Sequence, residues 1–215
     1  MKGYGFLGTA LERVKNISPE LASVMGTAAE FIPYAGKVLS MIKVERLSKR
    51  VKDHSKHLKK IAQLNSSSNM SSDYITERVF PIVLEGLIEE HEDAKINYIL
   101  TGFENVFIDE KTNESMVINY FDTLRDLRYM DLKRLFYLID ISEEFDFYQQ
   151  GEEESSVTRN IDKKLENMGL IGKNNFAIWG GNVDPMLRKE DVQIQPYGKS
   201  FVRFITNNEY EDKLS

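Results

Sequence analysis

The stretch "VERLSKRVKDHSKHLKKI", residues 44–61, carries an apolar pattern and a basic pattern at once. Six positions recur at spacings of 3, 4, 3, 4 and 3 residues, as in a heptad repeat: Val44, Leu47, Val51, His54, Leu58 and Ile61. This spacing predicts a helix with a narrow buried seam, which would pack within the chain or against a second copy. We expect this helix to run without interruption from Ala35 to Leu64.

Basic residues are concentrated around this seam. Residues 37–60 contain nine lysines and arginines against Glu45 and Asp53, whereas residues 61–215 contain sixteen against twenty-nine acidic residues. The formal charge of the whole chain is −6. An acidic body can neutralise a tethered basic segment, so the lysines do not by themselves indicate a nucleic-acid partner.

The composition is that of a globular protein. The chain has 215 residues, of which 41% are hydrophobic and 11% aromatic, which is enough to bury a core. It contains no cysteine, which excludes disulfides, a thiol nucleophile and a cysteine zinc site. We therefore expect a cytoplasmic protein, and the short apolar run near the N-terminus does not predict a secretory signal.

Helical periodicity covers the first two thirds of the chain, and short alternating runs follow. We predict a mainly α protein, in which Pro81 kinks or begins a helix. Its parts are an N-terminal helical hairpin (1–64), the linker "NSSSNMSSD" (65–73), a helical body (74–115), a winged-helix-like α+β module (116–208) and a tail (209–215).

The last third of the chain has the element order of a winged helix, which is two helices followed by two strands around a loop. Gly169 is expected to end the second helix in a left-handed conformation. The strands are expected in "FAIWGG" (176–181) and "VQIQPYG" (192–198), and a final helix is expected in "GKSFVRFI" (198–205).

Three segments carry a family resemblance: "FDTLRDLRYMDLKRLFYL" (121–138), "NIDKKLENMGLI" (160–171) and "VQIQPYGKSFVRFI" (192–205). Their order resembles the C-terminal half of bacterial proteins of the abortive-infection alpha family. The resemblance covers residues 118–206 and departs from the usual pattern at Gln195-Pro196. It implies a role in phage–host conflict, either in antiviral defence or in a phage-encoded reply, and it supplies no catalytic residues.

A winged helix raises the question of DNA binding. The expected contact residues for DNA or a protein partner are Arg159, Lys163, Lys164, Lys199 and Arg203. Acidic residues lie close to them in sequence: Glu152, Glu153, Glu154, Asp162 and Glu166. Because DNA affinity depends on neutralising several phosphates, this balance favours a protein partner, and a DNA-binding regulator is the alternative.

The segment before the basic run suggests a second alternative, attachment to a membrane surface. Glu30, Pro33 and Lys37 interrupt it too often for a spanning helix. An interfacial helix would use apolar residues followed by a lysine cluster: Phe31, Ile32, Tyr34, Leu39, Ile42, Lys43, Lys49 and Lys52. A hairpin packed on its own domain or on a second copy is the preferred interpretation.

Motifs that carry chemistry are scarce. In "EEHED" (residues 89–93), Glu89 and Asp93 would share a helical face that His91 does not, which disfavours a metal site. We therefore predict no enzymatic activity, no cofactor and no metal. The predicted function is to bind another macromolecule, above all a protein, which includes a second copy of the chain.

Overall fold

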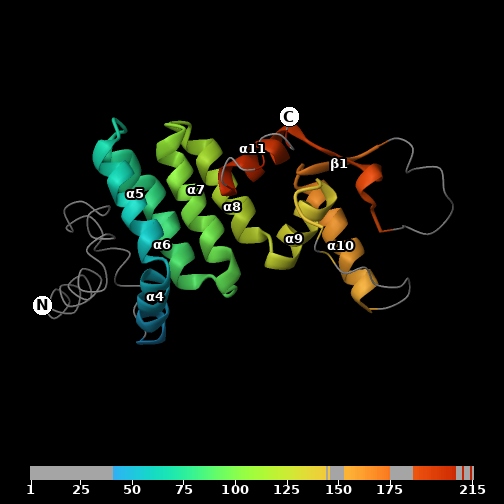
Figure 1. Ribbon diagram of the computed structural model, residues 1–215, viewed down its shortest axis with the longest axis horizontal. Coiled ribbons are helices and arrows are strands. Elements are labelled where there is room, and N and C mark those ends of the chain that lie inside the picture. Colours follow the sequence, from blue (N-terminus) through green and yellow to red (C-terminus); the bar gives the residue numbers. More distant parts are fainter. Residues whose placement is uncertain are drawn as a thin grey trace, which may run out of the picture. The chain divides into compact units, whose positions relative to one another are not determined.

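The computed structural model describes residues 41–143, 145, 153–174, 186–206, 210 and 214. The side chains of Met41, Ile42 and Val44 are not among the parts described. Within these residues the fold is mainly helical with a two-stranded sheet (Figure 1), which confirms the predicted mainly α class. The chain divides into two units, Met1–Arg125 and Asp126–Ser215. This division falls later than the predicted boundary at 115/116, so most of α8 belongs to the first unit.

The first unit packs its helices around an apolar core. Its described α-helices are α4 (Met41–Asp53), α5 (Ser55–Ser67), α6 (Phe80–Glu89), α7 (Ile96–Ile108) and α8 (Glu114–Asp126). α4 packs on α6, and α5 packs on α7. Four residues of the predicted seam are buried at these contacts: Leu47, Val51, Leu58 and Ile61. The seam therefore packs within the chain.

One continuous seam helix was predicted, but in the structure it is divided at His54. That residue has φ −105° and ψ 21°, outside the ideal helical region. Its N–H still donates to the Arg50 carbonyl at 2.9 Å, and its own carbonyl accepts from Leu58 at 3.0 Å. The first of these bonds belongs to the last turn of α4 and the second to the first turn of α5, so His54 separates the two helices. Residues 35–40 of the predicted helix lie outside the described residues.

Pro81 begins a helix, which is one of the two outcomes predicted for it. It lies in the first turn of α6, a position that proline favours. A π-helix, Tyr74–Val79, precedes α6, and the Phe80 N–H donates to the carbonyl of Ile75. The wider π-turn gives the proline ring room against the preceding backbone.

The predicted linker, residues 65–73, is shorter in the structure. α5 continues to Ser67, and helical backbone resumes at Ser72. The Ser66 and Ser67 hydroxyls donate to the carbonyls of Ala62 and Gln63, at 2.9 and 3.2 Å. These side-chain hydrogen bonds to the preceding turn allow the serines to remain helical. A prediction from small polar composition alone therefore made the linker too long.

The second unit contains three described α-helices and a short antiparallel sheet. They are α9 (Tyr129–Leu138), α10 (Glu153–Asn167), β1 (Ile171–Lys173), β2 (Val192–Ile194) and α11 (Pro196–Ile205). Ile171 pairs with Ile194 in the sheet. This order of elements agrees with the coarse prediction, and the winged-helix assignment stays a prediction.

Details of the second unit both confirm and correct the expected boundaries. Gly169 has φ +68°, which confirms it as the left-handed cap of α10. β1 begins two residues after this glycine, and the expected strand at 176–181 lies outside the described residues. α11 begins at Pro196, earlier than predicted, because proline is well suited to the first helical turn.

A buried ion pair joins the elements of the second unit. Arg134 on α9 is fully buried and donates to Asp162 on α10 through Nε (2.7 Å) and Nη2 (2.9 Å). Asp162 also accepts from the Leu187 N–H at 2.9 Å, and the Leu187 carbonyl accepts from Arg134 at 2.6 Å. The pair therefore fixes the segment that leads into β2.

Candidate functional site

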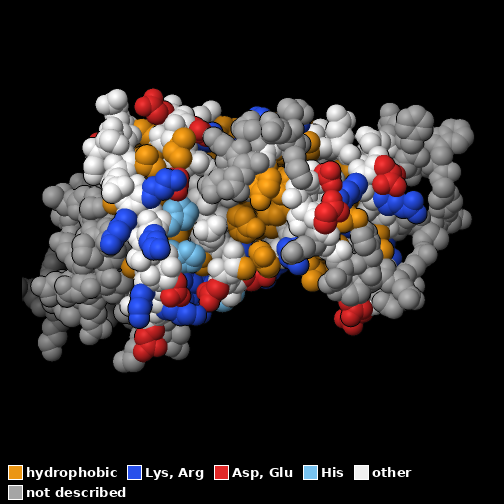
Figure 2. Space-filling model, viewed as in Figure 1, with side chains coloured by type: hydrophobic (Ala, Val, Ile, Leu, Met, Phe, Trp, Pro, Cys, Tyr) orange, Lys and Arg blue, Asp and Glu red, His pale blue; other side chains and the backbone are white. Residues whose placement is uncertain are grey.

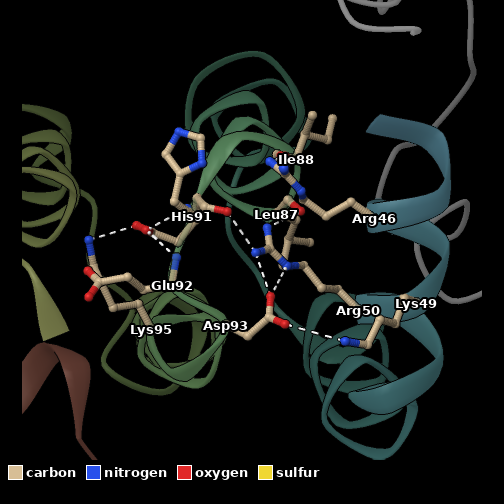
Figure 3. Close-up of polar contacts among 10 residues, drawn as sticks. Arg46, Lys49, Arg50, Leu87, Ile88, His91, Glu92, Asp93 and Lys95 are labelled. Carbon is tan, nitrogen blue, oxygen red and sulfur yellow. Dashed lines mark hydrogen bonds and ion pairs between the residues drawn. The ribbon is translucent and has the colours of Figure 1, made fainter. Parts of the chain in front are cut away.

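Arg50 on α4 is almost fully buried against the C-terminal end of α6 (Figure 3). Its guanidinium donates to the carbonyl oxygens of Leu87 (2.9 Å) and Glu90 (2.7 Å). It also donates to Asp93 Oδ1 from Nε (3.0 Å) and Nη2 (2.7 Å). Carbonyls at a helix end lack partners within the helix, so Arg50 caps α6 and neutralises the negative end of its dipole.

Other basic residues of α4 contact the same region. Arg46 donates to the Ile88 carbonyl at 3.1 Å, and Lys43 forms an ion pair with Glu89. Lys49 lies 3.4 Å from Asp93 Oδ2. Most of the basic side of α4 is therefore neutralised by the end of α6 and the acidic segment after it, within one unit.

The "EEHED" segment serves these contacts. Glu89 and Asp93 take part in the ion pairs to α4, and His91 is exposed. Hydrogen bonds from Arg50 lower the pKa of Asp93. Within the part of the chain that the structure describes, no group of three or more histidine, aspartate or glutamate residues is placed to hold a metal ion.

Glu90 points to a different partner, the buried Lys95. The Lys95 Nζ lies 2.7 Å from Glu90 Oε2, and the lysine is only 1% exposed. Burial opposes ionisation of Glu90, but the hydrogen bonds from Lys95 and from the Glu92 and His91 N–H groups outweigh it and lower its pKa. The segment after α6 is therefore ionised and held from two sides at neutral pH.

A second charged cluster joins α5 to α7. Glu104 on α7 is 3% exposed, and each of its oxygens meets a basic group of α5. His57 Nε2 lies 2.8 Å from Oε2, and Lys60 Nζ lies 2.5 Å from Oε1. The histidine contact is close but not aligned as a hydrogen bond. With both oxygens engaged, the carboxylate acts here as an anchor for α5.

The solvent side of α4 and α5, here called the α4–α5 arm (Met41–Ser67), carries a row of lysines. Lys49, Lys52, Lys56 and Lys59 recur at spacings of 3, 4 and 3 residues and are all exposed. We call these four residues the lysine line. Figure 2 shows lysine and arginine side chains gathered over this arm, beside histidines. The exposed Asp53 lies next to the line, between Lys52 and Lys56 in sequence.

The remaining seam and membrane residues are only partly described. His54 is half-buried, and its pKa is lowered by burial and by the neighbouring His57. The structure does not describe the side chains of Ile42 and Val44. Four further predicted membrane residues lie wholly outside the described residues: Phe31, Ile32, Tyr34 and Leu39. Among the helices that the structure describes, none is long and apolar enough to cross a bilayer.

The five contact residues predicted in the second unit lie on two helices. On α10, Lys164 donates to Asp131 (2.7 Å) and to the Asp126 carbonyl (2.6 Å), so its charge is used within the unit. Arg159 donates to the hydroxyls of Ser155 and Ser156, at 2.7 and 3.0 Å. Lys163 is exposed on the same helix.

The other two residues, Lys199 and Arg203, belong to α11. Arg203 is exposed, whereas Lys199 is half-buried and helps to line a shallow hollow of about 350 Å³. The other lining residues come from the end of α9 and from β2: Leu138, Ile139, Val192, Gln193 and Ile194. The hollow is therefore lined by both apolar and polar groups.

Sequence reasoning missed the carboxylate that holds α5. Glu104 lies four residues after Leu100 and three before Phe107, at the edge of the apolar face of α7. A charge at such a position signals a buried partner, because helices rarely bury an unpaired carboxylate. The buried Lys95 gave no comparable signal, since it lies only two residues after the acidic run that ends at Asp93.

Comparisons of the chain with protein-family models, with curated proteins and with solved structures found no match. Function is therefore inferred from the geometry of the residues above.

Proposed function

We propose that this protein is a non-enzymatic binding protein that contacts another protein through the lysine line. The observation that carries the proposal is that the apolar seam of the α4–α5 arm is buried in the first unit while the lysine line faces solvent. Because the seam is already packed, the arm holds its lysines in a fixed arrangement before any partner binds. Such preorganisation lowers the entropic cost of association.

Repulsion within this row of charge disfavours the helices that carry it. Like charges three or four residues apart on a helix destabilise it by about 0.2–0.5 kcal/mol per pair. Lys49 and Lys52 form such a pair on α4, and Lys56 and Lys59 form another on α5. Arg50, by contrast, points inward and stabilises the fold. An anionic partner outside the chain accounts for the exposed row.

A DNA-binding role for the second unit is less favoured. Lys164, one of the predicted contacts, already has an aspartate and a carbonyl as partners. An interfacial membrane role depends mainly on residues 31–42, most of which lie outside the described residues. The lysine line is the described basic surface that supports binding best.

The setting of this function is proposed from the family resemblance alone. Residues 118–206 resemble the abortive-infection alpha family, so we place the partner among the proteins of phage–host conflict in the cytoplasm. The resemblance leaves open whether the chain acts for the host or for the phage.

A pull-down from the native host, with and without phage infection, tests the proposal. The bait is the full-length chain, compared with Lys52→Glu/Lys56→Glu and with the charge-matched control Arg128→Glu/Arg188→Glu at two exposed positions of the second unit. We expect a partner protein that the control retains and the lysine-line variant loses. A partner that the lysine-line variant retains in full would contradict the proposal.

A further inference from the structure

The lysine line has a regular geometry that limits what can bind it. Lys49 and Lys52 lie three residues apart on α4, and Lys56 and Lys59 lie three residues apart on α5, so the members of each pair are about 4.5 Å apart along the helix axis. His54 separates the two pairs: its N–H donates within the last turn of α4, and its carbonyl accepts within the first turn of α5. Another α-helix with acidic residues at the same spacing would present carboxylates at the same intervals.

We propose that the lysine line, taken as the contact surface proposed above, binds an acidic α-helical segment of a partner protein. The helix lies along the α4–α5 arm and places its carboxylates opposite Lys49, Lys52, Lys56 and Lys59. Long lysine side chains reach such carboxylates without close backbone approach. Exposed ion pairs are individually weak, so several in register are needed for measurable affinity.

Asp53 distinguishes a protein partner from a nucleic acid or an anionic lipid surface. It is exposed and lies four residues after Lys49 and three before Lys56, among the cations. A phosphate backbone carries negative charge throughout and is repelled at this point. A polypeptide can place one basic residue opposite Asp53 and acidic residues around it. The mixed pattern therefore favours a helix that is acidic with one lysine or arginine in its row.

Synthetic helical peptides test this inference with the full-length chain. The first peptide carries glutamates at spacings of 3, 4 and 3 residues, matching the lysine line, with one lysine placed to face Asp53. The second has the same composition in scrambled order, with helicity matched by circular dichroism. A DNA duplex and vesicles of phosphatidylglycerol and phosphatidylcholine are the other probes. Binding is measured by fluorescence anisotropy and, for vesicles, by co-sedimentation.

We expect the patterned peptide to bind about tenfold more tightly than the scrambled one, as several weak ion pairs in register would give. Lys52→Glu/Lys56→Glu should remove this preference. Asp53→Lys should weaken binding of the patterned peptide and strengthen binding of the DNA duplex. Both substitutions alter exposed positions, and unchanged thermal unfolding would confirm that the variants fold.

Equal affinity for the two peptides, or tighter binding of the duplex or the vesicles than of the patterned peptide, would overturn the inference. The pull-down separates this failure from failure of the proposed function. If the chain binds both peptides equally but the lysine-line variant loses its partner in the pull-down, the lysine line is the contact surface and an acidic helix is not its ligand. If the partner is also retained, both are wrong.

Discussion

Arg50 donates two hydrogen bonds to a single oxygen of Asp93, at 2.7 and 3.0 Å, and so joins α4 to the acidic segment that follows α6. This relationship explains why a basic helix belongs to an acidic chain. The cations on the inner side of the α4–α5 arm are needed to hold the arm in place. Those of the lysine line are exposed on its outer side, and one of them, Lys49, also lies 3.4 Å from Asp93 Oδ2.

The Arg50 contacts predict a clear difference between inner and outer cations. Arg50→Ala should lower the free energy of unfolding by about 2–3 kcal/mol, because buried carbonyls lose a charged donor. Lys52→Ala should change it by no more than about 0.5 kcal/mol, since this side chain is exposed. Urea denaturation of the two variants measures both values. Equal effects would contradict the assignment of Arg50 as the inner anchor.

The first unit should lose stability on acidification in two steps. The pKa of His54 lies below 6.5 because burial and His57 disfavour its charged form, so the unfolded chain binds protons more readily below pH 6.5. The pKa values of Glu90 and Asp93 lie below 4.5 and 3.8, so their contribution is present above those values and is lost as the pH falls through the lowered ones.

Urea titrations between pH 8 and pH 3 measure this profile. His54→Gln should remove the upper step and leave the lower one. A wild-type stability that rises as the pH falls from 6.5 to 5 would have the opposite sign and would refute the role assigned to His54.

Backbone conformation predicts a stabilising change at the end of α7. Glu110 has φ +45°, a left-handed conformation that glycine adopts without strain. Glu110→Gly should therefore raise the free energy of unfolding by up to about 1 kcal/mol. Gly169→Ala, at the equivalent position after α10, should lower it by a similar amount, since this glycine has φ +68°. Thermal unfolding of both variants tests the pair, and shifts in the same direction would contradict it.

The buried pair of the second unit predicts strong non-additivity. Asp162→Leu leaves the Arg134 guanidinium buried without its carboxylate and should cost about 3–5 kcal/mol. Replacing both residues, Arg134→Met with Asp162→Leu, should cost clearly less than the single change. A double-mutant cycle from denaturation curves gives the coupling energy. A coupling near zero would show that the two residues act independently.

The apolar spacing predicted the parts of the fold that obey a single helical period. Leu47, Val51, Leu58 and Ile61 are buried as expected, because burial of a seam depends on spacing that sequence displays directly. The helix end at Gly169 could also be predicted, because few residues other than glycine readily adopt the left-handed conformation of such a cap.

Features that depend on distant partners were not predicted. The Arg50–Asp93 contact joins residues far apart in the chain, and charged residues are read as exposed unless a partner is known. β1 was not predicted, because three-residue strands carry almost no periodic signal. For the candidate site, the sequence identified the basic run but not which cations face inward, which required the packing of α4 on α6.

The most direct test of the central claim is the affinity of the full-length chain for the patterned acidic peptide, compared between wild type and Lys52→Glu/Lys56→Glu. We expect wild type to bind, binding to weaken with salt, and the variant to lose about tenfold or more in affinity. The charge-matched control Arg128→Glu/Arg188→Glu should bind as wild type does. Equal loss in the control and in the lysine-line variant would attribute binding to overall charge and contradict a specific role for the lysine line.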